Sequence, residues 1–157
     1  MYRKIFVPID GSAASNLGLK EAIKLAKARG AKLRLFHLVD EYVAVSSMDG
    51  VTLDTGDLLD ALRQIGRKIV AKAEAQARRS GIKPESVILE SFGGRAADFI
   101  VQQAKKWGAD IIVLGTHGRR GVKRLVMGSD AEQVVRTAPV PVLLVRAKTT
   151  ARTSGKT

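Results

Sequence analysis

The chain has 157 residues, 45% hydrophobic and 27% charged, which fits one soluble globular domain. It contains no cysteine, which excludes disulfides and thiolate metal sites and fits a reducing cytoplasm, where we expect the protein to reside. Its net charge of +12 suits anionic partners. No apolar run is long enough to span a membrane, and the first residues lack the apolar stretch of a signal peptide.

Strand-like and helix-like segments alternate through the first half of the chain. A strand is predicted over residues 4–9 and a second over 32–39, both rich in Ile, Val, Leu and Phe. Between them, apolar residues recur at helical spacing; Ser12 or Ser15 can cap this helix and Gly30 can end it. The segment 40–56 has no clear period and is predicted to be a loop.

The second half continues the alternation. A long helix is predicted over residues 58–80, ended by Gly81. Its expected apolar stripe is Leu58, Leu62, Ile65, Ile69, Ala73 and Ala77. Strands are predicted over 87–92, 110–116 and 142–146, and helices over about 97–107, ended by Gly108, and about 129–138. We expect one domain over 1–147, and the Thr-, Ser- and Lys-rich tail over 148–157 is predicted to be disordered.

This pattern predicts a parallel α/β sheet with helices on both faces, because its strands are apolar and each is followed by a helix. Doubly wound sheets bind ligands beyond the carboxyl ends of their strands, at the point where the strand order reverses. The segments that follow the first and fourth strands are therefore the first places to look for a site.

The fourth strand runs into a glycine-rich segment. Gly115-Thr116-His117-Gly118 follows the strand directly, and Gly128-Ser129 opens the last helix. Glycine lets the backbone approach a ligand closely, and the N–H groups at a helix start can bind an anion. The segment is a candidate phosphate cradle; alternatively it is an ordinary strand-to-helix loop with a helix cap at Ser129.

The first strand ends in Pro8-Ile9-Asp10-Gly11-Ser12. A carboxylate at the edge of a central strand could accept hydrogen bonds from ribose or hold a phosphate-bound metal. The alternative is an Asp-Gly turn in which Asp10 or Ser12 caps the following helix.

These segments resemble the universal stress protein family over nearly the whole chain, from Met1 to about Ala147. The resemblance rests on the opening strand and its Pro-Ile-Asp-Gly-Ser, on the closing Pro-Val-Pro-Val-Leu-Leu-Val, and above all on the pattern G-x2-G-x9-G-[S/T]. Gly115, Gly118, Gly128 and Ser129 meet that pattern. In this family the pattern marks the branch that binds ATP. The resemblance also implies a five-stranded parallel sheet in the order 3-2-1-4-5.

The resemblance implies a role for each matching position. Asp10 would contact the ribose or a phosphate-bound Mg²⁺, while Pro8 and the backbone of Val39 would border the adenine. Gly115, Gly118, Gly128 and Ser129 would hold the ribose and phosphates of ATP, with ADP or AMP as alternative ligands. The next residue, Asp130, departs from the small or neutral residue of many relatives. Its carboxylate would repel a triphosphate unless it points away or meets Mg²⁺ or arginine.

Two histidines and a basic run remain to be interpreted. His117 is expected to order the glycine-rich loop through a hydrogen bond, and His37 to be a satisfied histidine of the core or strand end. Arg119, with Arg120, Lys123 and Arg124, could neutralise phosphates or could be solvated loop charge.

Three functions compete. The first is a nucleotide-binding stress or signalling module with little or no turnover, because no base or transferable nucleophile is evident. The second is a slow ATPase or autokinase that uses Ser129, Asp10 and Mg²⁺. The third is a nucleic-acid binder, which we expect to be less suited because aromatic residues make up only 4% and the cations are not confined to one helix.

The last predicted strand carries an expectation about assembly. Val142-Leu143-Leu144-Val145 is apolar and would lie at a sheet edge in the order 3-2-1-4-5. An uncovered apolar edge invites pairing with another chain, so we expect a homodimer through this strand, as the resemblance also implies. The alternative is a monomer whose own basic tail covers the edge.

Overall fold

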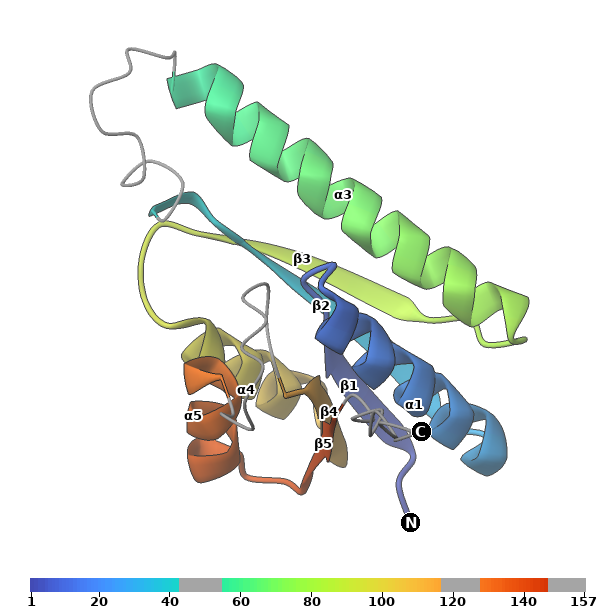
Figure 1. The fold of residues 1–157 in the computed structure, drawn as a ribbon. Helices are drawn as coiled ribbons and strands as arrows, with labels where there is room; N and C mark the ends of the chain where they lie inside the picture. Colours follow the sequence, from blue (N-terminus) through green and yellow to red (C-terminus); the bar gives the residue numbers. More distant parts are fainter. Residues whose placement is uncertain (43–54, 117–127, 147–157) are drawn as a thin grey trace, which may run out of the picture.

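The computed structural model describes residues 1–42, 55–116 and 128–146 (Figure 1). The tail predicted over 148–157, most of the loop predicted over 40–56, and His117, Gly118 and Arg119 lie outside these residues. The elements follow in the order β1 (Lys4–Pro8), α1 (Ala13–Arg29), β2 (Lys32–Asp40), α3 (Thr55–Arg79), β3 (Glu85–Ser91), α4 (Ala96–Trp107), β4 (Ile111–Gly115), α5 (Ser129–Thr137) and β5 (Val142–Val145).

The strands form one parallel sheet in the order β3-β2-β1-β4-β5, which confirms the predicted topology. From β1 the chain first adds β2 and β3 on one side of β1, and then crosses back to add β4 and β5 on the other side of β1. The order therefore reverses between β1 and β4, and the carboxyl ends of these two strands are neighbours. This is the position at which a doubly wound sheet offers a crevice for a ligand.

Two apolar cores lie on the two faces of the sheet. Helices α1 and α3 cover one face, and α4 and α5 cover the other (Figure 1). Strand residues alternate between them: Ile5 and Val7 pack beneath α1 and α3, whereas Phe6 packs with Phe36 on the α4 side. The central strands are buried on both faces, while β3 and β5 at the edges are only half-buried.

Helix ends follow the local rules read from the sequence. Ser12 is the N-cap of α1, and its side chain accepts a hydrogen bond from the Ser15 amide. Gly30 and Gly108 end α1 and α4 in the left-handed conformation, with φ values of 61° and 73°. Within the described residues no helix combines the length and apolarity that a membrane crossing needs.

The predicted stripe of α3 is wrong at Ile65, whose side chain is 48% exposed. The buried face of the helix instead runs through Gly66, Val70, Ala73 and Ala77. Gly66 lies against the His37 ring, where an added β-carbon would sit 3.0 Å from Cδ2. A search for apolar side chains at helical spacing does not identify such a buried position, because glycine has no side chain. The helix also begins at Thr55, three residues before the predicted start.

Candidate functional site

The turn after β1 holds Asp10 in a closed set of hydrogen bonds. The Ser12 amide donates to Asp10 Oδ1 at 2.8 Å, the Ser15 amide to Ser12 Oγ at 3.1 Å, and the Asp10 amide to Ser15 Oγ at 3.1 Å. Gly11, with a φ of 79°, supplies the left-handed residue that the turn needs. The turn-and-cap interpretation of this segment is thus confirmed, and it fixes the Asp10 carboxylate at the carboxyl edge of β1.

Pro8 and Val39 lie at the same edge on neighbouring strands. Pro8 ends β1 and is paired in register with Phe36 of β2, and Val39 lies three residues further along β2. Val39 is 4% exposed, so its side chain belongs to the core and its backbone is the part that a ligand could approach.

His37 is confirmed as a satisfied core histidine. Its ring is 7% exposed, and Nδ1 lies 2.8 Å from the Ile9 carbonyl oxygen, which makes Nδ1 the protonated nitrogen of that contact. The Ile9 amide in turn donates to the Phe36 carbonyl at 2.8 Å. These bonds hold the backbone that leads into Asp10, so His37 helps to position the site.

Gly115 ends β4 against the first turn of α1. A β-carbon at this position would lie 2.2 Å from the Ala14 carbonyl oxygen and 2.9 Å from the Ser15 amide nitrogen. Gly18, one turn further along α1, makes the reverse contact, since its own β-carbon would lie 3.0 Å from the Gly115 nitrogen. The glycine at 115 is therefore required by the contact between strand and helix, whatever its part in ligand binding.

Thr116 carries an orphaned hydroxyl beside the start of α5. Its amide donates to the Val145 carbonyl at 3.0 Å, and its own carbonyl accepts from the Gly128 amide at 3.0 Å. Thr116 is 5% exposed, yet its Oγ1 is buried and has no hydrogen-bond partner among the described residues. A buried hydroxyl in that state costs free energy unless a ligand or solvent satisfies it. The sequence alone assigns no role to Thr116, although this residue lies within the glycine-rich segment.

Helix α5 begins at Ser129 with Gly128 as its N-cap, so the prediction of a cap at Ser129 is wrong by one residue. The first helical hydrogen bond of α5 runs from the Glu132 amide to the Gly128 carbonyl, at 3.0 Å. In the part of the chain that the structure describes, no side chain caps this helix start, so its first amides are open to another partner. Ser129 and Asp130 are both exposed in the first turn.

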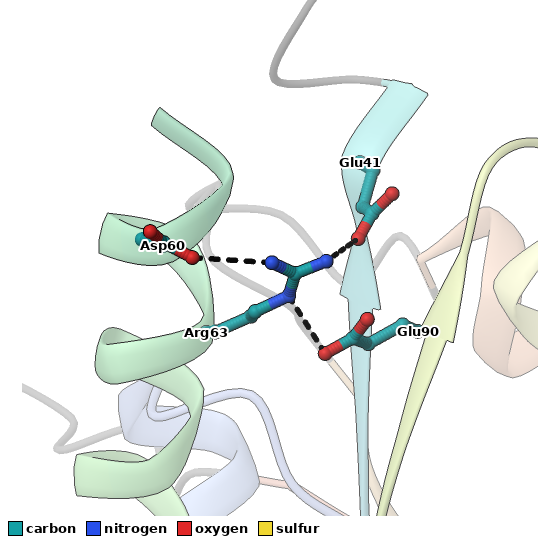
Figure 2. Close-up of polar contacts among 4 residues, drawn as sticks. All are labelled: Glu41, Asp60, Arg63 and Glu90. Atoms are coloured by element: carbon teal, nitrogen blue, oxygen red, sulfur yellow. Dashed lines mark hydrogen bonds and ion pairs between the residues drawn. The ribbon is translucent and has the colours of Figure 1, made fainter. Parts of the chain in front are cut away.

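A second polar cluster at this edge was missed by sequence reasoning. Figure 2 shows Arg63 of α3 reaching Glu41 after β2, Glu90 of β3 and Asp60 of its own helix, at 3.3, 2.9 and 3.1 Å. The Glu90 hydrogen bond, more than any other contact, raises the pKa of Arg63. Only the pair with Asp60 has a helical spacing that a sequence can reveal. The cluster ties the start of α3 to the ends of β2 and β3.

Asp10 is the one metal ligand that the sequence suggested. Within residues 1–42, 55–116 and 128–146, no three His, Asp or Glu side chains are grouped as a metal site would require. A cation at Asp10 could draw further ligands from the phosphates it accompanies or from water.

The comparisons with known proteins agree with this architecture. The model of the universal stress protein family matches residues 1–146. Universal stress protein MJ0531 of Methanocaldococcus jannaschii is 36% identical over 148 residues, which cover 93% of this chain and 83% of that protein.

Solved structures of the same family share the fold. A family member from Burkholderia pseudomallei is 31% identical with a TM-score of 0.74, covering 93% of this chain and 97% of that one. The universal stress protein of Archaeoglobus fulgidus, solved in complex with dAMP, is 26% identical with a TM-score of 0.63, covering 91% and 97%. A family model that spans almost the whole chain, together with relatives above 30% identity, establishes that this chain belongs to the universal stress protein family.

Proposed function

We propose that this protein is an ATP-binding module of a stress-response or signalling system, and that it holds the nucleotide at the carboxyl edge of the sheet between β1 and β4. The observation that carries the proposal is that two groups without hydrogen-bond partners among the described residues lie side by side: the Thr116 hydroxyl and the start of α5. The Gly128 amide, which donates to the Thr116 carbonyl, holds them together. Both are hydrogen-bonding groups that phosphate or ribose oxygens would satisfy.

Further support comes from the position of the remaining groups. Asp10 lies at the end of the strand next to β4, on the side where the strand order reverses. The relative from A. fulgidus was solved with dAMP, an adenine nucleotide. In this proposal Gly115, Gly118, Gly128 and Ser129 hold the ribose and phosphates, and Pro8 and Val39 border the adenine. Asp10 meets ribose or Mg²⁺, with His117, Arg119 and Asp130 close to the phosphates.

ATP is the proposed ligand, with ADP and AMP as alternatives that would share its adenosine contacts. Mass spectrometry of nucleotide released from the freshly purified protein tests this choice. ATP in the released material supports the proposal, whereas AMP alone would reassign the ligand.

The proposed activity is ATP binding with little or no turnover. We propose the cytoplasm as its location, because a chain without cysteine fits a reducing compartment. Slow hydrolysis or autophosphorylation through Ser129, Asp10 and Mg²⁺ is the competing activity. Incubation of pure protein with ATP and Mg²⁺, followed by chromatography of the nucleotides, separates the two. Accumulation of ADP that disappears in Asp10→Asn would favour the enzyme.

We also propose that two copies pair through β5. This strand lies at the edge of the sheet, as predicted, and is hydrogen-bonded to β4 on one side. Leu143, in the middle of the strand, is 37% exposed. An edge of this kind can accept a second copy of itself in antiparallel pairing about a two-fold axis.

A further inference from the structure

Cations that are scattered along the sequence are collected by the fold at the amino edge of the sheet, opposite the proposed nucleotide site. In a parallel α/β fold the carboxyl ends of the helices return to the amino ends of the strands, as α3 and β3 do in Figure 1. Six exposed residues at this edge, which we call the basic edge, are Lys27, Arg29, Lys32, Lys83, Lys105 and Lys106.

Contacts around Lys4 show that these residues share one surface. Lys4 is paired in register with Lys32, and the Lys32 amide donates to the Arg3 carbonyl at 2.8 Å. Lys4 Nζ donates to the Trp107 carbonyl at 3.1 Å, at the end of α4 immediately after Lys105 and Lys106. The basic edge thus runs from α4 on one face of the sheet, past the starts of β1 and β2, to α1 on the other face.

The carboxylates at this edge are already engaged. Glu85 is bonded to the Arg34 guanidinium, which with the nearby Lys32 lowers the pKa of the carboxyl. Asp110 accepts from the Arg3 and Lys4 amides at 2.8 and 2.9 Å. Arg34 also lies over the Trp107 ring, 4.6 Å from its centre. None of the six residues of the basic edge forms an ion pair with a carboxylate of the described chain.

The helix dipole accounts for only part of this accumulation. Cations in the last turn of a helix are stabilised by its negative end, which explains Lys27, Arg29, Lys105 and Lys106. Lys32 begins a strand and Lys83 lies in the connection before β3, where no such stabilisation applies. Unpaired like charges on one surface repel each other, so their accumulation indicates a partner that carries negative charge.

The character of the edge favours a nucleic-acid backbone over other polyanions. Protein interfaces and membrane-inserting surfaces place exposed apolar side chains among their charges. Here Met1 and Tyr2 are exposed just before β1, but the exposed aromatic pair Tyr42 and Phe92 lies at the opposite edge, and exposed Ile65 and Ile88 lie within α3 and β3. The scarcity of aromatic residues counts against single strands, which bind by stacking, and not against a duplex, which binds through its phosphates.

We propose that the basic edge binds the phosphate backbone of a nucleic acid duplex without reading its sequence. Such binding releases counterions, so its affinity falls steeply with salt. It is separate from the nucleotide site, which lies at the other end of the strands.

Fluorescence anisotropy with a labelled DNA duplex tests the proposal. We expect the affinity of the full chain to fall by about 100-fold or more between about 50 and 200 mM salt. The variant Lys32→Glu/Lys105→Glu/Lys106→Glu should bind at least about 10-fold more weakly, with a salt slope that is shallower by about 3. The matched control, Lys20→Glu/Lys68→Glu/Lys72→Glu, reverses the same number of exposed lysines in α1 and α3.

Three results would overturn the proposal. Equal losses in the two variants would mean that net charge, not this edge, attracts the duplex. Binding that does not weaken with salt would exclude a phosphate-backbone mode. Sedimentation of the protein with phosphatidylserine vesicles, without duplex binding, would assign the edge to membranes. Circular dichroism and ATP binding should be the same in both variants, because neither changes the core or the opposite edge.

Discussion

Gly115 at the end of β4 lies so close to Ala14 in the first turn of α1 that a β-carbon on Gly115 would sit 2.2 Å from the Ala14 carbonyl oxygen. Gly128 belongs to the same glycine pattern but differs in this respect. Among the described residues, its β-carbon would have only the Thr116 carbonyl oxygen nearby, at an ordinary 3.6 Å. Two glycines of one motif thus have different physical reasons to be there.

This difference predicts opposite results for two matched substitutions. Gly115→Ala should lower the free energy of unfolding by about 3 kcal/mol, because backbone on both sides must move to admit one methyl group. Gly128→Ala should cost no more than about 1 kcal/mol, the usual loss for alanine at an N-cap. Urea denaturation followed by circular dichroism measures both. Similar losses would contradict the assignment of Gly115 to packing between β4 and α1.

Asp10 can be tested with a pair of variants that separate its two roles. Asp10→Asn keeps the oxygen that accepts from the Ser12 amide, so the turn should survive, but it removes the charge. We expect ATP binding to weaken by about 10- to 100-fold in the presence of Mg²⁺, the usual cost of losing a hydrogen bond to a charged group. Asp10→Ala should lose both binding and some stability.

Calorimetry with and without Mg²⁺ distinguishes a ribose contact from a metal contact at Asp10. If the loss in Asp10→Asn appears only with Mg²⁺, the carboxylate holds the cation. If Asp10→Asn binds ATP as tightly as the wild type in both conditions, Asp10 is a turn residue alone.

The edge strand offers a precise test of dimerisation. The Pro141 carbonyl accepts from the Ile112 amide, and the Val145 carbonyl accepts from the Thr116 amide. Successive residues of a strand point their backbone groups to opposite sides, so the N–H of Leu144 points away from β4, toward the open edge of the sheet. Leu144→Pro therefore removes a donor from the proposed dimer seam without removing one from the β4 ladder. Light scattering should give a two-chain mass for the wild type and a one-chain mass for a folded variant. A wild-type mass of one chain, unchanged by ATP, would exclude the dimer.

The Arg34–Glu85 pair predicts a small acid dependence of stability. The folded-state pKa of Glu85 is lowered, chiefly by the hydrogen bond from Arg34, so its contribution is present above the unfolded-state pKa and is lost as the pH falls through the folded-state value. Glu85 is 45% exposed, which limits the contribution to less than about 1 kcal/mol after screening. Glu85→Gln should therefore be less stable than the wild type at pH 7, and the difference should vanish in acid. A difference that persists at acid pH would mean that the carboxylate charge is not its cause.

Much of the fold could be predicted because its signals are local. The cap at Ser12 and the glycines that end α1 and α4 depend on neighbours within a few residues. The strands could be predicted because each is a nearly continuous run of apolar residues. Ile65 shows where this fails: the buried face of α3 is set by Gly66 against His37, a contact across 29 positions of the chain.

The same limit applies to the candidate site. Asp10 and the start of α5 could be predicted because a turn and a helix start are determined by residues that are adjacent in the sequence. The Arg63 cluster and the Gly115–Ala14 contact join residues from different elements, and only the fold brings them together. The orphaned state of the Thr116 hydroxyl is likewise a property of its surroundings, which no residue type reveals by itself.

Isothermal titration calorimetry of ATP into the nucleotide-free protein, with Gly118→Val as the comparison, decides whether this chain binds ATP at the carboxyl edge of its sheet. We expect saturable binding at one site per chain that the valine abolishes while the fold survives. The unfolding temperature of the wild type should also rise by about 5–10 °C at ATP concentrations about 100-fold above the dissociation constant. No heat of binding and no change in unfolding temperature at millimolar ATP, or equal affinity in Gly118→Val, would contradict ATP binding at this edge.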